Sequence, residues 1–450
     1  MNNQQFSVIY DNHHYWLKNA HIPVCFVETD FDIPSQTREG LSLMDIEISE
    51  GLITQVVYSS THLPSLETNI PTIDLKGGQV WPCFVDMHTH LDKGHIWVRS
   101  PNSDGSFNGA LDAGARDAKE YWNAEDIYRR MEFGLKCSYA HGTKAIRTHL
   151  DCFAEQANIS LEVFQALQKE WEGRLILQPV SLVTGDYYLT EAGEKLADKI
   201  ADVGGVLGAV PFMSSDIDNQ LDRLFSLAKE RQLNLDLHTD ENGDPNSRVL
   251  HKVAEKAISH QFSGKIICGH CCSLAVQTSE KVTETLELVK DSGISIVSLP
   301  MCNLYLQNRQ DNYTPRWRGV TLLHELKKQG ISVAIASDNC RDPFFGFGDH
   351  DVLEVFNMSV RIAHLDMPYG DWPCSVTKTP ADLIGLSNIG RIRVGLAADL
   401  VLFKGRNFSE LLSRSQHDRV ILRNGGVIDR TLPDYCELDS LFGVAELKYE

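Results

Sequence analysis

Four histidines and one aspartate stand at intervals along the 450-residue chain, and both residue types bind metal ions. His88 and His90 are separated by one residue, a spacing that in a strand places both imidazoles on the same side. His238, His270 and Asp338 follow far downstream, each near the end of an apolar run. Because imidazole and carboxylate ligands suit Zn²⁺ or Fe²⁺, we expect one divalent metal ion per chain.

The intervals between these residues match the repeat of a strand–helix unit. The segment from His90 to His238 spans roughly four units, that from His238 to His270 roughly one, and that from His270 to Asp338 roughly two. In a (β/α)8 barrel, such spacing places all of them on one rim at the carboxyl ends of the strands, where the active sites of these barrels lie.

Eight apolar runs alternate with helix-like segments through the middle of the chain, a pattern typical of parallel βαβ units. Two of the intervening segments, 219–232 and 320–330, carry an apolar stripe at helical spacing. We therefore predict an α/β fold of the (β/α)8 TIM-barrel type. A doubly wound open sheet is the alternative, but no Gly-x-Gly-x-x-Gly loop follows the first run. The runs are 79–90, 143–151, 175–183, 204–213, 233–241, 265–272, 294–300 and 331–339.

Both ends of the chain show short strand-like segments that alternate apolar and polar residues. The segment 419–429 also contains an Asn-Gly-Gly turn signal. We expect the two ends to pair in one sheet of a small β-sandwich-like domain. The predicted domains are residues 1–78 and 393–450 for the β domain and 79–392 for the barrel.

Composition argues against several classes of partner. The formal net charge of −19 repels phosphate backbones, so we expect no nucleic acid. No apolar run approaches the ~20 residues that span a bilayer, so we expect no membrane partner. The first residues lack the basic and apolar regions of a signal peptide, and the eleven cysteines are typical of buried thiols in a reducing compartment. We therefore expect a cytoplasmic protein.

Glu241, in the segment HTDEN, is the candidate for moving protons. A bound cation lowers the pKa of its water to about 7 and so creates a hydroxide nucleophile. A carboxylate just beyond His238 could take the proton of that water and deliver it to a substrate. The alternative is an acid in the first turn of a helix, stabilised by the helix dipole. The residues alone leave open which of His238 and His270 binds the metal.

The motifs FVDMHTHLDK, IRTHLD, HTDEN, GHCCS, SDNCRDPF and GLAADLVLF resemble those of the amidohydrolase superfamily. The segment NLYLQNRQDNYTPRWRGVT is similar to the bacterial cytosine deaminase branch in particular. The resemblance implies that Glu241 is the proton shuttle and that His270 orients the metal-bound water. It implies a mononuclear centre, because no lysine ends the run 204–213, and it counts Asp338 as catalytic as well. The implied metal ligands are His88, His90, His238 and Asp338.

The resemblance implies a metal-dependent hydrolytic deaminase that acts on a cytosine-like N-heterocycle. In the implied reaction, a metal-bound hydroxide attacks an amidine-like ring carbon, Glu241 protonates the ring nitrogen, and ammonia leaves. The carbon–nitrogen bond that is cut belongs to a cyclic amidine and not to a peptide. Two alternatives stay open, a ring-opening cyclic amide hydrolase and a catalytically silent binding protein of the same fold. Homo-oligomers are common in the superfamily, so a homo-oligomer also stays open.

The expected substrate-binding positions depart from the cytosine deaminase pattern. Where that branch carries a glutamine that reads the pyrimidine, this chain has Val183, and Gln178 lies five residues upstream. A polar substrate group left unpaired costs about 1 to 3 kcal/mol. The second acid of the branch is Asn339 here, and its aromatic residue is Phe344. We therefore expect a related ring, such as isocytosine, a substituted pyrimidine, a pterin or a creatinine-like cyclic amidine.

The segment Cys268-Gly269-His270-Cys271 also resembles a thiol-exchange or zinc-knuckle motif. However, Cys268 lies inside a predicted strand, and alternation places it on the same side as His270. We expect His270 to carry the chemistry and the cysteines to fill space. The irregular stretch 91–115, which is rich in Gly, Asn and Ser, follows the first run and is a candidate lid.

Overall fold

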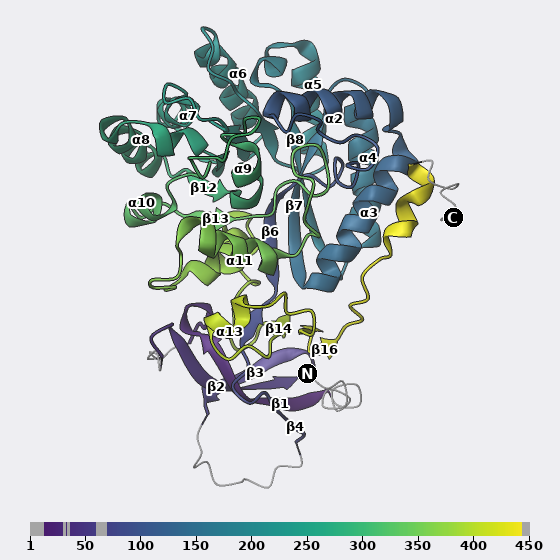
Figure 1. Cartoon of the computed structure of the whole chain (residues 1–450), viewed down its shortest axis with the longest axis vertical. Helices are drawn as coiled ribbons and strands as arrows, with labels where there is room; N and C mark the ends of the chain where they lie inside the picture. The colour runs from purple at the N-terminus through teal and green to yellow at the C-terminus, as the bar shows by residue number, and fades with distance from the viewer. Residues whose placement is uncertain (1–12, 30–32, 34–36, 60–69, 443–450) are drawn as a thin grey trace. The chain divides into compact units, whose positions relative to one another are not determined.

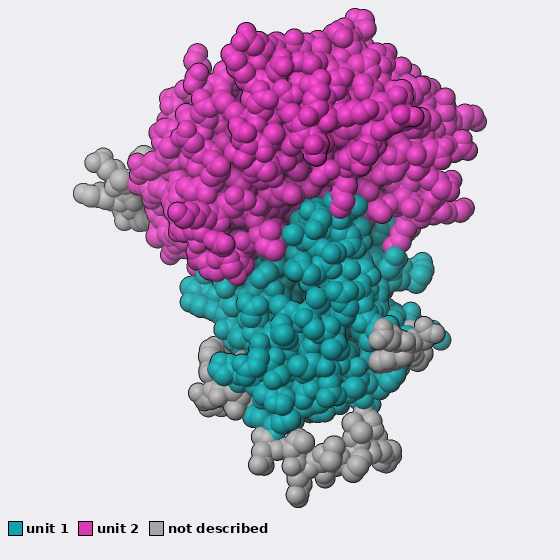
Figure 2. All heavy atoms as spheres, turned by 180° about the vertical axis from the view of Figure 1, so that it is seen from behind, with its two compact units in different colours: residues 1–85, 139–144, 352–431 teal, residues 86–138, 145–351, 432–450 magenta. Residues whose placement is uncertain are grey.

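The computed structural model describes residues 13–29, 33, 37–59 and 70–442 of the chain (Figure 1). The chain divides into two compact units (Figure 2). One unit comprises residues 1–85, 139–144 and 352–431, and we call it the β-rich unit. The other comprises residues 86–138, 145–351 and 432–450, and we call it the α/β unit. No helix among the described residues is long and apolar enough to cross a bilayer.

Each of the eight apolar runs contributes one strand to one of two sheets. The strands pair in parallel, which confirms the α/β fold. A three-stranded sheet has the order β6-β7-β8, and a five-stranded sheet has the order β13-β12-β11-β10-β9. Strands β7 and β8 pair in parallel, as do all neighbours in the larger sheet. The strands are β6 (Phe84–Thr89), β7 (Thr143–Asp151), β8 (Ile176–Leu182), β9 (Leu207–Ala209), β10 (Leu235–Thr239), β11 (Ile266–His270), β12 (Ser295–Ser298) and β13 (Val333–Ile335).

Isolated parallel bridges join the edges of these two sheets. Val180 of β8 pairs with Val206 just before β9, and Thr184 pairs with Val210 just after it. At the other edge, Thr89 of β6 pairs with Asp338, three residues beyond β13. The edge strands of the two sheets are thus paired by bridges on both sides.

Helices follow the strands and lie around their outer side in Figure 1. The two predicted helical segments correspond to α6 and α10. Helix α6 buries Leu221, Leu224, Phe225 and Ala228, the spacing of one helix face. The helices are α2 (Phe107–Tyr121), α3 (Ala124–His141), α4 (Gln156–Glu170), α5 (Glu191–Asp202), α6 (Ile217–Glu230), α7 (Val249–Ser259), α8 (Ser279–Asp291), α9 (Pro300–Leu306) and α10 (Leu323–Lys328).

The stretch 91–115, expected to be an irregular loop, is irregular only in its first part. Helix α2 begins at Phe107, and the hydroxyl of Ser106 accepts a hydrogen bond of 2.9 Å from the amide of Gly109. This side chain satisfies one of the free amides of the first turn. The expectation of a loop through residue 115 is therefore wrong, and the second part of the stretch is a helix.

The β-rich unit contains two four-stranded sheets, with the orders β3-β2-β1-β4 and β16-β15-β14-β5. The expected single sheet is therefore wrong, because the C-terminal strands pair with β5 (Val80–Pro82). The first predicted run is broken after β5, since Pro82 has no amide for a ladder. The other strands are β1 (His14–Pro23), β2 (Leu41–Ser49), β3 (Leu52–Tyr58), β4 (Thr72–Asp74), β14 (Leu400–Leu402), β15 (Val420–Arg423) and β16 (Gly426–Val427).

The predicted Asn-Gly turn joins β15 to β16, with positive φ angles of 45° at Asn424 and 72° at Gly425. The core of the β-rich unit is centred on the buried ring of Trp81, which contacts five phenylalanine rings at centroid distances of 5.0 to 6.2 Å. These rings are Phe26, Phe84, Phe356, Phe403 and Phe408. Helices α11 (Val352–Ala363), α12 (Lys378–Leu383) and α13 (Phe408–Leu412) belong to the same unit.

Candidate active site

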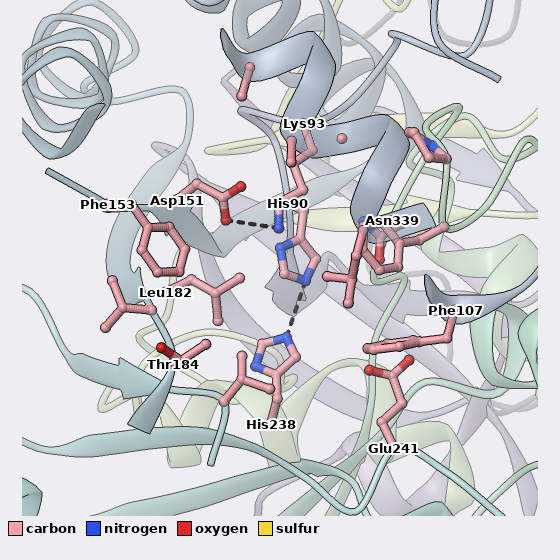
Figure 3. A pocket seen from close by; sticks show the side chains of 18 of the residues that line it. His90, Lys93, Phe107, Asp151, Phe153, Leu182, Thr184, His238, Glu241 and Asn339 are labelled. Atoms are coloured by element: carbon pink, nitrogen blue, oxygen red, sulfur yellow. Dashed lines mark hydrogen bonds and ion pairs between the residues drawn. The ribbon is translucent and has the colours of Figure 1, made fainter. Parts of the chain in front are cut away.

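The four side chains expected to bind metal meet at the carboxyl ends of β6, β10 and β13, and we call them the metal quartet. His238 Nε2 lies 3.2 Å from His88 Nε2 and 3.3 Å from His90 Nε2. Asp338 Oδ1 lies 3.6 Å from His88 Nε2 and 3.2 Å from His90 Nε2. Figure 3 shows the rings of His90 and His238 pointing toward each other. Three segments that are far apart in the sequence thus direct four ligand atoms toward one point.

The distances within the metal quartet suit a tetrahedral ion. A zinc–nitrogen distance of about 2.0 to 2.1 Å places the ligand atoms of an ideal tetrahedron about 3.3 Å apart. Both carboxylate oxygens of Asp338 are buried and accept no hydrogen bond from an N–H or O–H group of the described residues. Such a carboxylate is costly unless it is paired with a positive charge. The donor set therefore fits a divalent cation.

Burial also prepares the histidines of the metal quartet as ligands. It lowers the pKa of His88, His90 and His238 well below the ordinary value, and neighbouring positive charge lowers it further. The imidazoles are therefore neutral near pH 7, which is the form that binds metals.

The segment that carries Asp338 is held by Asp86 of β6. Ser337 donates hydrogen bonds to the Asp86 carboxylate from its amide at 3.0 Å and from its hydroxyl at 2.5 Å. The amide of Asp338 donates to the carbonyl of His88 at 2.9 Å. Asp338 has a φ angle of 68°, a left-handed conformation that is rare outside glycine and occurs at functional sites.

Glu241 and His270 lie beside the metal quartet. His270 Nδ1 lies 3.4 Å from Glu241 Oε1 and accepts a hydrogen bond of 3.0 Å from the side-chain amide of Asn303. With this amide orientation the ring proton is on Nε2. Burial, followed by the charge of Asp338, raises the pKa of Glu241 well above its ordinary value. Helix α7 begins only at Val249, so the alternative of Glu241 as a first-turn acid is wrong.

A cavity of about 510 Å³ opens onto these residues. Three of the expected substrate-binding residues, Val183, Asn339 and Phe344, line it together with Glu241. Gln178 is not among the lining residues, because its side chain accepts a hydrogen bond of 2.8 Å from Arg147 Nε. The structure thus does not bring Gln178 to the cavity. The lining is mostly apolar, and helix α2 contributes Phe107, Leu111, Gly114, Ala115, Ala118 and Lys119 to it.

Sequence reasoning missed three charged residues in this cavity, Lys93, Lys119 and Asp151. Lys93 Nζ lies 2.8 Å from Asp151 Oδ1, and Figure 3 shows the pair beside His90. Lys93 Nζ also lies 5.5 Å from the centre of the Phe344 ring. The available signal for Lys93 and Asp151 was their position, since Asp151 is the last residue of β7 in the motif IRTHLD and Lys93 lies shortly after β6 in the motif HTHLDK.

A further histidine in the cluster, His149 of β7, was also missed. Its ring centroid lies 4.0 Å from that of His88, and its Nε2 lies 3.3 Å from Asp236 Oδ1. Arg147 contacts the other oxygen of Asp236 at 2.7 Å. The signal was its place two residues before the end of the second predicted strand.

The cysteines near His270 do not contribute to the cavity lining. Cys268, Cys271 and Cys272 are all buried and are absent from the described lining residues. Burial raises the pKa of each of these thiols. All eleven cysteines of the chain are free thiols. These positions agree with the expectation that the cysteines fill space.

Comparison with known proteins places this geometry in a family. The model of the amidohydrolase family matches residues 71–131 and 132–422, so the chain belongs to that family. This confirms the resemblance to the amidohydrolase superfamily that the sequence motifs carried.

Individual relatives include several deaminases. The chain is 49% identical to a pterin deaminase of Rhizobium rhizogenes over 95% of this chain and 96% of the relative. It shares its fold with a 5-methylcytosine deaminase of Klebsiella pneumoniae, with a TM-score of 0.77, 23% identity and coverage of 93% and 98% of the two chains. An adenosine deaminase of Xanthomonas campestris with bound zinc is similar in fold at a TM-score of 0.62, with 15% identity over 95% and 96% of the chains.

Proposed function

We propose that this chain is a metal-dependent deaminase that hydrolyses the amino group from a pterin or a similar fused pyrimidine. Hydrolytic deamination of an N-heterocycle, expected from the sequence, is confirmed by the relative that is 49% identical. The pterin ring and the residue roles are the proposal. The observation that carries it is the presence of Glu241 and His270 beside the metal quartet in one apolar cavity.

The metal quartet would hold one divalent cation, Zn²⁺ or Fe²⁺, because its nitrogen and oxygen donors suit both ions. When bound, the cation lowers the pKa of a water molecule and so supplies a nucleophile at neutral pH. The zinc in the similar adenosine deaminase supports this assignment. The ring of His149, whose Nε2 lies 3.3 Å from Asp236 Oδ1, packs beside the ring of His88 at a centroid distance of 4.0 Å and would restrict its rotation.

Glu241 would move the protons of the reaction. Its carboxylate takes a proton from the attacking water and gives it to the ring nitrogen next to the amino-bearing carbon. The hydroxyl on that carbon then gives up the second proton of the water, which passes to the amino group. The carbon–nitrogen bond breaks, ammonia leaves, and the ring gains an oxo group. His270, with its proton on Nε2, would donate a hydrogen bond to the attacking oxygen. The hydrogen bond from Asn303 to Nδ1 holds His270 in that tautomer.

The other cavity residues would recognise the ring. Val183 offers no hydrogen bond, whereas the ammonium of Lys93 and the amide of Asn339 can donate to a ring carbonyl. The rings of Phe107 and Phe344, at a centroid distance of 5.8 Å, offer apolar surface to a flat heterocycle. A cavity of about 510 Å³ also has room for a ring system wider than a single pyrimidine.

The test is ammonia release from a panel of amino-heterocycles by metal-loaded protein, with Glu241→Gln as the matched variant. We expect the highest kcat/KM for pterin over isocytosine, cytosine, guanine and creatinine. The Glu241→Gln variant should be slower by a factor of about 10² to 10⁴ while it keeps its metal, because the amide cannot carry the proton. A ring-opening hydrolase would instead yield a new carboxylate without ammonia. Metal-loaded wild-type protein that releases no ammonia from any member would refute the proposal.

The finer account of the fold is also proposed. We infer that the eight strands close into a (β/α)8 barrel, which the parallel bridges at both sheet edges support. The domain limits 1–78 with 393–450, and 79–392, stay predictions. So do a cytoplasmic location, a homo-oligomer and the absence of a membrane partner. The absence of a nucleic-acid partner is a prediction as well, and the charge of −19 is its main support.

A further inference from the structure

A second group of metal-ligating side chains lies in the α/β unit, separate from the metal quartet. His95 Nε2 lies 3.2 Å from His350 Nε2, and the ligand atoms of His95, Cys340 and His350 all lie within 4.8 Å of one another. All three side chains are buried. The mechanism proposed above uses none of them.

The pair of histidines repeats the geometry of the metal quartet. Its Nε2–Nε2 distance of 3.2 Å matches the 3.2 and 3.3 Å found there. The ring centroids of His95 and His350 lie 5.3 Å apart at 52°, whereas those of His90 and His238 lie 5.3 Å apart at 59°. Zinc bonds of about 2.05 Å to nitrogen and 2.3 Å to sulfur require N–N and N–S separations of roughly 3.3 and 3.6 Å. The distance of 3.2 Å between His95 Nε2 and His350 Nε2 is already close to the required N–N separation.

The backbone is shaped to bring these imidazoles together. His95 has a φ angle of 66° and His350 one of 54°, both in the left-handed region that costs free energy in residues other than glycine. Helix α3 carries Gly134 at the point of contact, where a Cβ atom would lie 3.0 Å from His350 Nε2. Two strained residues and a glycine at one contact indicate that the position of the rings is under a local constraint.

Burial and the charged groups nearby set the protonation state of His95. Burial lowers the pKa of His95 well below its ordinary value, and His350, Arg341 and Arg130 lower it further. The imidazole is thus neutral and able to bind a metal. Arg130 is paired with Asp126 at 2.6 Å, and the Arg341 guanidinium stacks on the ring of Tyr435 at 4.3 Å. The Asp126 carboxylate offsets the charge of Arg130, and the guanidinium of Arg341 is held over the ring of Tyr435.

We propose that His95, Cys340 and His350 bind one transition-metal ion of the zinc type, in addition to the ion of the metal quartet. The site would join the stretch after β6 to the stretch after β13. These stretches already meet through hydrogen bonds from His95 N to the Cys340 carbonyl at 3.1 Å and from Trp97 N to the Arg341 carbonyl at 2.9 Å.

The proposed ion would hold two walls of the cavity in place. The stretch after β6 supplies Lys93 and leads into Phe107, whereas the stretch after β13 supplies Asn339 and Phe344. A structural ion at their junction would keep both walls at a fixed separation without taking part in the reaction.

Cobalt titration of metal-free wild-type protein tests the second site directly. The metal quartet contains no sulfur, so a thiolate-to-cobalt charge-transfer absorption can arise from Cys340 but not from the quartet. We expect about two Co²⁺ per chain and this absorption in the near ultraviolet. Cys340→Ser and His350→Asn should each bind about one ion, and Cys340→Ser should lose the absorption. Cys83→Ser, which removes another buried thiol in the β-rich unit, is the control and should retain both.

The outcomes separate this site from the deaminase proposal. Wild-type protein that saturates at about one Co²⁺ without the absorption would overturn the second site, and the His95–His350 contact would then be a plain hydrogen bond. Retention of the absorption in Cys340→Ser would overturn it as well. The wild-type titration decides even if a variant fails to fold. Two bound ions with the absorption in a protein that deaminates nothing would support the second site and refute only the proposed reaction.

Discussion

At the scale of single residues, Lys93 and Val183 face the same cavity but offer different contacts to a ring. Val183 stands where the cytosine deaminase pattern has a glutamine, so a carbonyl at that side of the ring would have no donor from it. Lys93 comes from another strand end and is held at 2.8 Å from Asp151. An ammonium group is a stronger donor than an amide, which suits it to read a ring carbonyl.

Lys93→Met should therefore lower kcat/KM for pterin by about 10 to 100-fold, because a hydrogen bond from a charged donor contributes about 1.5 to 3 kcal/mol. For a pterin analogue that lacks the 4-oxo group, Lys93→Met should lower kcat/KM much less, because the analogue makes no such hydrogen bond with Lys93. The measurement is kcat/KM for both substrates, with metal content as a check on folding. Lys93→Arg keeps the charge and should lose less than Lys93→Met. Equal losses on the two substrates would show that Lys93 does not read the carbonyl.

The members of the metal quartet were candidates because they stand at or just beyond the ends of strands that are spaced at fitting intervals. The spacing left His238 and His270 as alternatives, and only the family resemblance implied His238 as the ligand. His149 carried the signal of its place near the end of β7, whereas Asn303 carried none. Asn303 lies on α9 and reaches His270 only through the tertiary fold, so no sequence spacing reveals the contact.

At the scale of elements, the strands were easier to predict than helix α2. Each strand is an apolar run between turn signals, which periodicity detects directly. The first turns of α2 contain Asn108, Gly109 and Gly114, residues with low helix propensity, so the stretch had the composition of a loop. The helix begins there because Ser106 caps it and because Ala110 and Ala113, three residues apart, are buried on one face.

Ser106→Ala should loosen the start of α2, since loss of such a cap costs about 0.5 to 2 kcal/mol. We expect a higher KM with a smaller change in kcat, because Phe107 would be less well placed whereas the metal quartet is untouched. Faster hydrogen exchange at the amide of Gly109 would report the same loosening. Ser106→Asp retains a capping oxygen and is the matched control. If both variants behave like the wild type, the cap does not govern the cavity wall.

At the scale of the whole molecule, the metal quartet links elements that are distant in the chain. Its ligands come from β6 of the three-stranded sheet and from β10 and the end of β13 of the five-stranded sheet. Periodicity predicted the eight strands of the two sheets but could not predict that the C-terminal strands pair with β5. That pairing depends on the burial of Trp81 among phenylalanines from distant segments, which is a property of the assembled core.

Because the quartet joins both sheets, removal of its metal should destabilise the folded chain. An ion that binds only the native state at 100 times its Kd contributes about 2.7 kcal/mol. We therefore expect Tm to fall on treatment with a chelator and to recover on addition of Zn²⁺. Glu241→Gln should show the same fall and recovery although it is inactive, since its ligands are intact. His90→Asn should show a smaller change, because it lacks one ligand. If the Tm of Glu241→Gln does not change with the chelator, the metal quartet binds no stabilising ion. Because this variant is inactive in any case, the result tests metal binding separately from catalysis.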